Sequence, residues 1–199
     1  VEFDSIDGQV FSYRGASYAI PLLGEHQLHN AATVLEAISV LRKQGWDIDD
    51  EAVESGLYSV AWPARFEVLH TDDPWFVLDG GHNPQCAAAL RECLEHYFPD
   101  SKRVALVGVL KDKDYKSIAA MLAPLFDACV CVTPPSERAL PAEELAELFK
   151  DSCREVCVAG TVEDGVDLAR DIAQEQDAMV CAFGSLYICG QIRSCFGLR

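Results

Sequence analysis

The sequence is poor in positive charge. It has 16 Lys and Arg residues against 32 Asp and Glu, which gives a formal net charge of −16. Surfaces that bind nucleic acids depend on clustered Lys and Arg, so this balance excludes a nucleic acid as the expected partner. A phosphate ligand would need locally concentrated cations, for which Arg65, Lys111 and Lys113 are the candidates.

Three ligand-site signatures are also absent. The sequence has no Gly-x-x-x-x-Gly-Lys-Ser/Thr loop, no Gly-x-Gly-x-x-Gly fingerprint and no Gly-x-Ser-x-Gly elbow. These motifs respectively cradle nucleotide phosphates, bind dinucleotides and present a hydrolase nucleophile. The chain therefore lacks a phosphate loop of that type, and a nicotinamide enzyme or an α/β-hydrolase is disfavoured.

Long apolar runs and a leader sequence are missing as well. No run approaches the roughly 20 apolar residues of a membrane span, and the start shows no signal-peptide pattern. We expect no membrane partner and a cytoplasmic location. The first residue is Val1, within a strand-like alternation, and we interpret the chain as a piece of a longer protein.

Cysteine, by contrast, is abundant, with nine residues but no Cys-x-x-Cys pair. The spacing of zinc ligands is absent. Cys129, Cys131 and Cys181 fall in apolar strand patterns. We therefore interpret the cysteines as reduced, mostly buried small apolar side chains.

The pattern changes at Trp62-Pro63, where we place a domain boundary between residues 1–62 and 63–199. Residues 1–24 alternate loosely between apolar and polar and predict two or three strands. A helix is predicted from Gly24 to Gly45 and a second over Asp49–Tyr58, with Asp49 as its N-cap.

After the boundary, strands and helices alternate, which predicts an α/β fold with a Rossmann-like, doubly wound and mostly parallel sheet. Ligands of such sheets bind beyond the carboxyl ends of the strands. The predicted strands are Phe66–His70, Trp75–Asp79, Val104–Val109, Ala128–Thr133, Glu155–Ala159 and Ala178–Ala182. The predicted helices are Gln85–Tyr97, Lys116–Ala123, Ala142–Lys150, Val162–Gln174 and one from Leu186.

Four residues near the expected ligand edge carry candidate chemistry. Arg65 is able to grip phosphate oxygens, or is a solvated surface residue. Asp79 is suited to ribose hydroxyls or a cation, or to capping the next helix. A lone His such as His82 often has only a structural role, but His82 follows two glycines at the ligand edge, which favours a functional role. Ser185 is expected to cap the last helix. The N-terminus of that helix favours an anion such as a carboxylate, and the alternative is that Ser185 is a cap without a role in binding.

The loop Lys111–Asp114 also follows a strand and is rich in charge. Its position suits a loop that closes over a substrate. The alternative is a solvated charged loop without a role in binding.

Taken together, these segments resemble the C-terminal part of the folylpolyglutamate synthase/dihydrofolate synthase family, within the Mur ligase superfamily. Lys111-Asp112-Lys113-Asp114 resembles the family's Asp-Lys-Asp loop. Ala64 and Gly81 stand where the family commonly has Gly and Ala, and we expect these small departures to matter little. The motifs that carry the resemblance are Gly24-Glu25-His26-Gln27-Leu28-His29-Asn30-Ala31, Trp62-Pro63-Ala64-Arg65-Phe66-Glu67, Leu78-Asp79-Gly80-Gly81-His82-Asn83-Pro84 and Gly184-Ser185-Leu186-Tyr187.

The resemblance implies ATP-dependent addition of L-glutamate to folate through an acyl phosphate. Residues 1–62 would be the C-terminal end of the central ATP-binding domain and residues 63–199 the glutamate ligase domain. Asn30, Arg65 and Asp79 would contact ATP, and His82 and Ser185 the incoming glutamate, with His82 the catalytic residue. The family's phosphate loop and Mg²⁺ ligands would lie in a part not included here. We expect the chain to be a monomer. Without the missing part, the isolated chain would be inactive.

Two alternatives remain open from the sequence. One is a Mur-type ligase that adds an amino acid to a nucleotide-linked cell-wall precursor. The other is a non-catalytic nucleotide- or folate-binding module. Trp62-Pro63-Ala64-Arg65-Phe66-Glu67 and Gly184-Ser185-Leu186-Tyr187 favour the folate branch.

Overall fold

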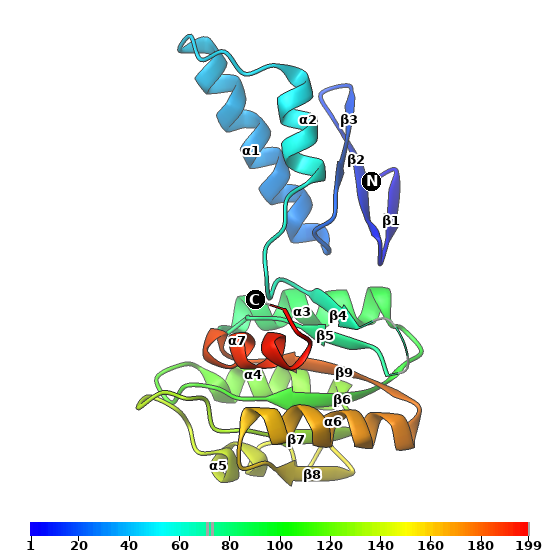
Figure 1. Cartoon of the computed structure of the whole chain (residues 1–199), viewed down its shortest axis with the longest axis vertical. Helices are drawn as coiled ribbons and strands as arrows, with labels where there is room; N and C mark the ends of the chain where they lie inside the picture. The colour runs from blue at the N-terminus through cyan, green and yellow to red at the C-terminus, as the bar shows by residue number, and fades with distance from the viewer. Residues whose placement is uncertain (71, 73, 199) are drawn as a thin grey trace. The chain divides into compact units, whose positions relative to one another are not determined.

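The computed structural model describes residues 1–70, 72 and 74–198. Its contacts divide the chain into two compact units, Val1–Pro63 and Ala64–Arg199. Figure 1 shows the helices and strands of each unit. Each unit has its own hydrophobic core. None of the described helices is long and apolar enough to cross a bilayer.

The first unit joins a small antiparallel sheet to two helices. Its apolar core draws on both layers, as expected where a half-buried sheet packs on amphipathic helices. The predicted N-cap is confirmed, since the Asp49 carboxylate accepts the Ala52 N–H at 2.6 Å. The elements are β1 (Phe3–Ser5), β2 (Gly8–Tyr13), β3 (Ala16–Ile20), α1 (Glu25–Lys43) and α2 (Asp50–Tyr58), and the core residues are Phe11, Ile20, Ala31, Leu35, Val53 and Leu57.

The second unit is built on a six-stranded sheet in the order β4-β5-β9-β6-β7-β8. The strands are β4 (Glu67–His70), β5 (Phe76–Leu78), β6 (Lys102–Val107), β7 (Ala128–Cys131), β8 (Glu155–Val158) and β9 (Ala178–Phe183). Strand β4 is antiparallel to β5, and the other pairings are parallel. The predicted mostly parallel α/β sheet is confirmed.

Helices cover both faces of this sheet. Figure 1 shows α6 and α7 over the near face, with α3 and α4 behind it. Strands β5, β6, β7 and β9 are almost completely buried, which explains their continuous apolar sequences. The helical elements are α3 (Pro84–Tyr97), α4 (Tyr115–Leu122), the 3-10 turn η1 (Ala123–Leu125), α5 (Ala142–Glu147), α6 (Val162–Gln176) and α7 (Leu186–Cys195).

Most predicted boundaries differ from the structure by one to three residues, as two examples show. Strand β4 begins at Glu67 because Phe66 adopts φ +45°, a left-handed conformation that cannot continue a strand. Helix α5 ends at Glu147 rather than at Lys150. The first difference is relevant to the candidate site, since it places Arg65 in a turn rather than beside a regular strand.

Candidate functional site

The carboxyl ends of three neighbouring strands form one edge of the second unit. The Asp79 N–H, after β5, donates to Ala182 O of β9 at 2.8 Å, and the Gly108 N–H, after β6, donates to Phe183 O at 3.3 Å. Gly184 has φ +109°, and a Cβ atom there would lie 2.7 Å from Gly108 O. The backbones therefore approach so closely that position 184 requires glycine.

Asp79 organises the turn after β5 through its carboxylate. Oδ2 accepts the Phe66 N–H at 3.0 Å, and Oδ1 accepts the Gly81 N–H at 2.7 Å. The alternative that Asp79 caps the following helix is wrong, because Asn83 caps α3 by accepting the Cys86 N–H at 2.8 Å. The Asn-Pro step, with proline in the first helical turn, was the available sequence signal for that cap.

The two departures from the family pattern are not as minor as expected. Ala64 adopts φ +56°, where glycine is favoured, and its left-handed conformation costs about 1–2 kcal/mol. At Gly81, a Cβ atom would lie 2.7 Å from Asp79 Oδ1 and 2.8 Å from Cys86 Cβ. Glycine at position 81 thus makes room for the carboxylate that the turn depends on.

The Arg65 side chain is half-buried and lies close to the turn after β5. Its Nη1 donates to Ala64 O at 3.3 Å. A Cβ atom built on Gly80 would lie 3.4 Å from Arg65 Nη1 and 2.4 Å from Leu186 Cδ2. The guanidinium therefore lies beside Gly80, close to the first residue of α7.

The charges of Asp79 and Arg65 also affect the pKa of Cys189, which lies on α7. Burial raises the pKa of its thiol to about 12, with a further upward contribution from Asp79 and a downward one from Arg65. The thiol is protonated near neutral pH and unsuited to act as a nucleophile.

His82 is half-buried in the loop before α3. Its Nδ1 lies 3.1 Å from Gly80 O. Since a carbonyl oxygen only accepts, Nδ1 carries the proton in this contact, and Nε2 is the acceptor nitrogen of the neutral ring. The imidazole can therefore accept a proton through Nε2.

Ser185 is the predicted N-cap of α7, and the structure confirms that cap. Its Oγ accepts the Tyr187 N–H at 3.2 Å, and the residue is 2 % exposed. The first backbone N–H groups of α7 lie at the same edge as Asp79 and Gly108. Such groups favour a bound anion.

The charged loop Lys111–Asp114 is fastened to the loop after β7. The Lys111 N–H donates to Arg138 O at 2.9 Å, and the Arg138 guanidinium pairs with Asp112. This guanidinium holds the pKa of Asp112 below its usual range. Asp114 caps α4. These contacts favour a fixed edge of the site over a loop that closes.

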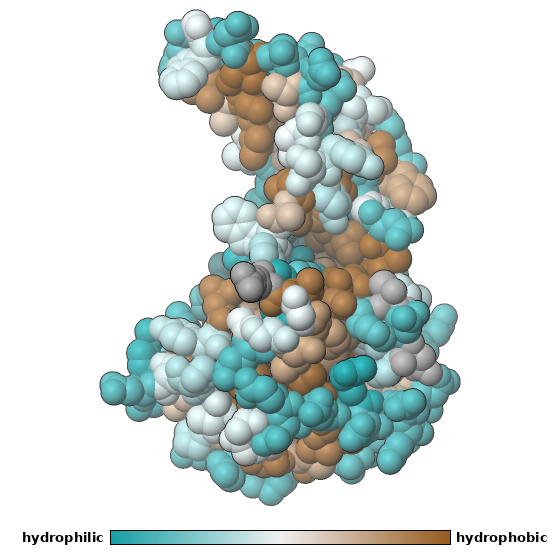
Figure 2. Space-filling model, viewed as in Figure 1, coloured by the Kyte–Doolittle hydropathy of each residue, from teal (hydrophilic) through white to brown (hydrophobic). Residues whose placement is uncertain are grey.

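Asn30 belongs to the first unit, so it is described separately. Its Nδ2 donates to Gln27 Oε1 at 3.0 Å on α1. It borders a mainly aliphatic groove of about 350 Å³ between α1 and α2. Figure 2 shows hydrophobic side chains over this region of the first unit.

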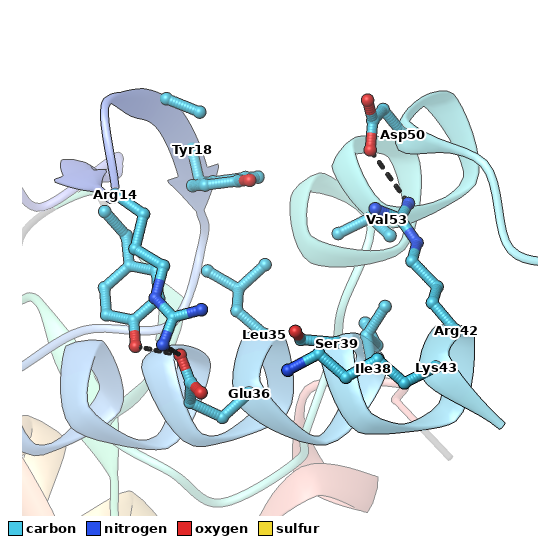
Figure 3. A pocket seen from close by; sticks show the side chains of 12 residues that line it. Arg14, Tyr18, Leu35, Glu36, Ile38, Ser39, Arg42, Lys43, Asp50 and Val53 are labelled. Atoms are coloured by element: carbon cyan, nitrogen blue, oxygen red, sulfur yellow. Dashed lines mark hydrogen bonds and ion pairs between the residues drawn. The ribbon is translucent and has the colours of Figure 1, made fainter.

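A larger cavity of the first unit, about 460 Å³, is lined by none of the predicted site residues (Figure 3). Its arginines are paired with acids: Arg14 with Glu36 and Arg42 with Asp50, at 2.7 and 2.8 Å. These two ion pairs compensate the arginine charges, and Lys43 also lines the cavity.

Sequence reasoning missed an ion pair that joins the two ends of the second unit. The Glu67 carboxylate pairs with Arg193 of α7, 126 residues away. Glu67 stands within one of the motifs, but the sequence contains no signal for its partner.

The family model described as "Mur ligase, glutamate ligase domain" matches residues 64–186. This chain belongs to the Mur ligase family. The matched segment holds Arg65, Asp79, His82 and Ser185, whereas Asn30 precedes it.

Relatives of this Mur ligase chain include folate enzymes. It is 33% identical over 216 residues to dihydrofolate synthase/folylpolyglutamate synthase of Mycobacterium tuberculosis, covering 97% of this chain and 44% of the relative. It is 37% identical over 176 residues to a probable bifunctional folylpolyglutamate synthase/dihydropteroate synthase of Halobacterium salinarum, covering 88% of this chain and 21% of the relative.

A solved structure of the same group is that of Mycobacterium tuberculosis folylpolyglutamate synthase complexed with ADP and AMPPCP. It superposes with a TM-score of 0.87 at 32% identity, over 98% of this chain and 46% of that one. The chain thus spans less than half the length of these relatives.

A metal centre was not predicted within this chain. Across residues 1–70, 72 and 74–198 of this Mur ligase chain, no group of three or more His, Cys, Asp or Glu is placed to hold a metal ion.

Proposed function

We propose that this chain is part of an enzyme that adds L-glutamate to folate, using ATP to form an acyl phosphate. The observation that carries the proposal is the meeting of Arg65, the Asp79–His82 turn and the Ser185 cap in the second unit. The folylpolyglutamate synthase relatives support it, as does the nucleotide held by the solved relative.

In this proposal, residues 1–62 are the end of the central ATP-binding domain and residues 63–199 the glutamate ligase domain. Asn30, which belongs to residues 1–62, is the proposed ATP contact of that segment. The phosphate loop and the Mg²⁺ ligands would belong to a further part of the enzyme. The free cysteines of the chain support a reducing, cytoplasmic location.

The phosphoryl-transfer step needs negative charge to be held and neutralised. Arg65 supplies a permanently charged guanidinium with donors arranged for phosphate oxygens. Asp79 accepts backbone hydrogen bonds on both carboxylate oxygens, so it fixes the turn on which a ribose would rest.

The amide-forming step needs the glutamate nitrogen close to the acyl carbon. The α7 N-terminus at Ser185 suits a glutamate carboxylate. His82 Nε2 is available to accept a proton from the amino group. The nitrogen then forms the C–N bond, the acyl–phosphate bond breaks, and inorganic phosphate leaves.

The test uses the full-length protein that contains this chain, with ATP, radiolabelled L-glutamate and two alternative acceptors, tetrahydrofolate and a nucleotide-linked peptide. We expect ATP-dependent transfer of label to the folate and release of phosphate. Label transferred only to a nucleotide-linked peptide would identify a cell-wall ligase instead. Nucleotide or folate binding without any transfer would indicate a binding module. The isolated 199-residue chain should not turn over.

A further inference from the structure

Arg65 stands between two residues in the left-handed region of backbone conformation. Ala64 has φ +56° and Phe66 has φ +45°. Non-glycine residues persist there only where the surrounding structure fixes them, and such residues cluster at functional sites. The contacts that hold this turn therefore influence the position of the Arg65 guanidinium.

Two carboxylates receive the backbone donors on either side of Arg65. Glu67 Oε2 accepts the Ala64 N–H at 2.8 Å, and Asp79 Oδ2 accepts the Phe66 N–H at 3.0 Å. Hydrogen bonds to an ionised acceptor are stronger than neutral ones. The turn is thus fixed from both sides by negative charge.

Glu67 is itself held by Arg193. The two side chains are 22 % and 13 % exposed, so water screens their attraction less than at an open surface. Arg193 lies on α7, the helix that Ser185 caps. The ion pair consequently connects the turn around Arg65 to the helix that begins at the candidate site.

The peptide carbonyl before Arg65 is fixed as well. Ala64 O accepts the Gly80 N–H at 2.9 Å and the Arg65 Nη1 donor at 3.3 Å. Reorientation of the Ala64–Arg65 peptide would break both bonds. The Ala64 N–H belongs to the preceding peptide unit, and its bond to Glu67 fixes the other side of the same residue. The guanidinium position therefore depends on Glu67 without direct contact between them.

We propose that Glu67, held by Arg193, is a positioning residue that sets the nucleotide affinity of the site by fixing the Arg65 turn. The proposal rests on the proposed function in one respect, the assignment of Arg65 to the phosphates. A purely structural ion pair would affect thermal stability and leave nucleotide affinity unchanged.

The experiment measures the calorimetric Kd for ADP and the KM for ATP in the full-length protein that contains this chain. Glu67→Gln should weaken ADP binding by roughly tenfold, the size of one lost charge-assisted hydrogen bond. Arg193→Gln should act in the same direction, and Arg193→Lys should recover part of the loss. The matched control is Glu95→Gln, which removes another Arg–Glu pair, on α3.

A double-mutant cycle separates positioning from general destabilisation. In an Arg65→Ala background, Glu67→Gln should cause no further loss of ADP affinity. Thermal unfolding identifies a variant that fails to fold. If Glu67→Gln or Arg193→Gln does not fold, the ADP affinity of Arg193→Lys is compared with that of the wild type instead. A folded Glu67→Gln or Arg193→Gln protein with unchanged ADP affinity would overturn the proposal. Equal losses with and without the Arg65 side chain would overturn it too.

Failure of the proposed function gives a different pattern. Wild-type protein that binds ADP but transfers no glutamate would reject the folate ligase, while the cycle on ADP affinity would still decide the role of Glu67. An unchanged ADP Kd in Arg65→Ala would reject the phosphate role of Arg65, and the positioning role of Glu67 with it.

Discussion

The Asp79 carboxylate accepts the backbone N–H of Phe66 at 3.0 Å, across thirteen residues of sequence. This bond joins the segment around Arg65 to the turn after β5. The two motifs recognised separately in the sequence are therefore parts of one structural unit.

Replacing Asp79 with Asn should loosen this unit. An amide has one acceptor oxygen, so it cannot receive both the Phe66 and Gly81 N–H groups as the carboxylate does. We expect a loss of about 1–3 kcal/mol in the free energy of unfolding, measured by urea denaturation. Asn83→Ala, which removes the α3 cap instead, is the comparison. Unchanged stability in Asp79→Asn would contradict the proposed anchoring.

Ser185→Ala should remove the α7 cap and raise the KM for glutamate more than the KM for ATP. The cap itself is worth about 1 kcal/mol. Thr161→Ala is a matched control, because Thr161 caps α6 in the same way by accepting the Asp164 N–H at 3.0 Å. Steady-state kinetics of the full-length protein should separate the two variants. Similar glutamate KM values for both would reject a binding role for Ser185.

Gly184→Ala and Gly190→Ala should change stability in opposite directions. At position 184 the φ of +109° and the nearby Gly108 O leave no space for a methyl group. At position 190, within α7, a Cβ would meet no atom within 4 Å. Alanine there should stabilise the helix by about 0.5–1 kcal/mol. The midpoints of denaturant unfolding measure both changes in stability. An unchanged midpoint in Gly184→Ala would contradict the close approach of the two backbones.

The Cys189 thiol should make the protein less stable at alkaline pH. Its folded pKa of about 12 lies above the ordinary thiol value of 9.0, so the unfolded chain loses this proton first. The stabilising contribution is complete below pH 9 and declines as pH rises toward 12. Denaturation at a series of pH values, with Cys189→Ala as the comparison, tests this. A slope that is identical in the two proteins would count against it.

Alkylation provides an independent check on the same thiol. Cys195 is exposed near the end of α7, whereas Cys189 is buried. Iodoacetamide should therefore modify Cys195 long before Cys189 in the native protein, as followed by peptide mass spectrometry. Equal modification rates would show that Cys189 is accessible.

Sequence periodicity was sufficient for most of the elements. The apolar strands and the N-caps at Asp49 and Ser185 depend on residues close together in the chain, and the structure contains them. The antiparallel direction of β4 was not predicted, because strand direction depends on pairing partners rather than on composition.

The candidate site was predictable only as a set of residue types at one edge of the sheet. The acceptor role of Asp79 depends on the left-handed turn at Phe66, which local pattern does not reveal. The partnership of Glu67 with Arg193 depends on the complete fold between them. Both are consequences of tertiary contact, and neither leaves a signal in a short window of sequence.

The contact between Glu67 and Arg193 also brings the beginning and the end of the second unit next to each other. A domain whose ends are neighbours can be joined to other segments at a single place on its surface. The second unit is therefore suited to circular permutation: a short linker between its ends, with new ends opened in a distant exposed loop, would keep every strand pairing intact. The same closeness makes it a portable module that can be inserted into another chain with little disturbance of its core.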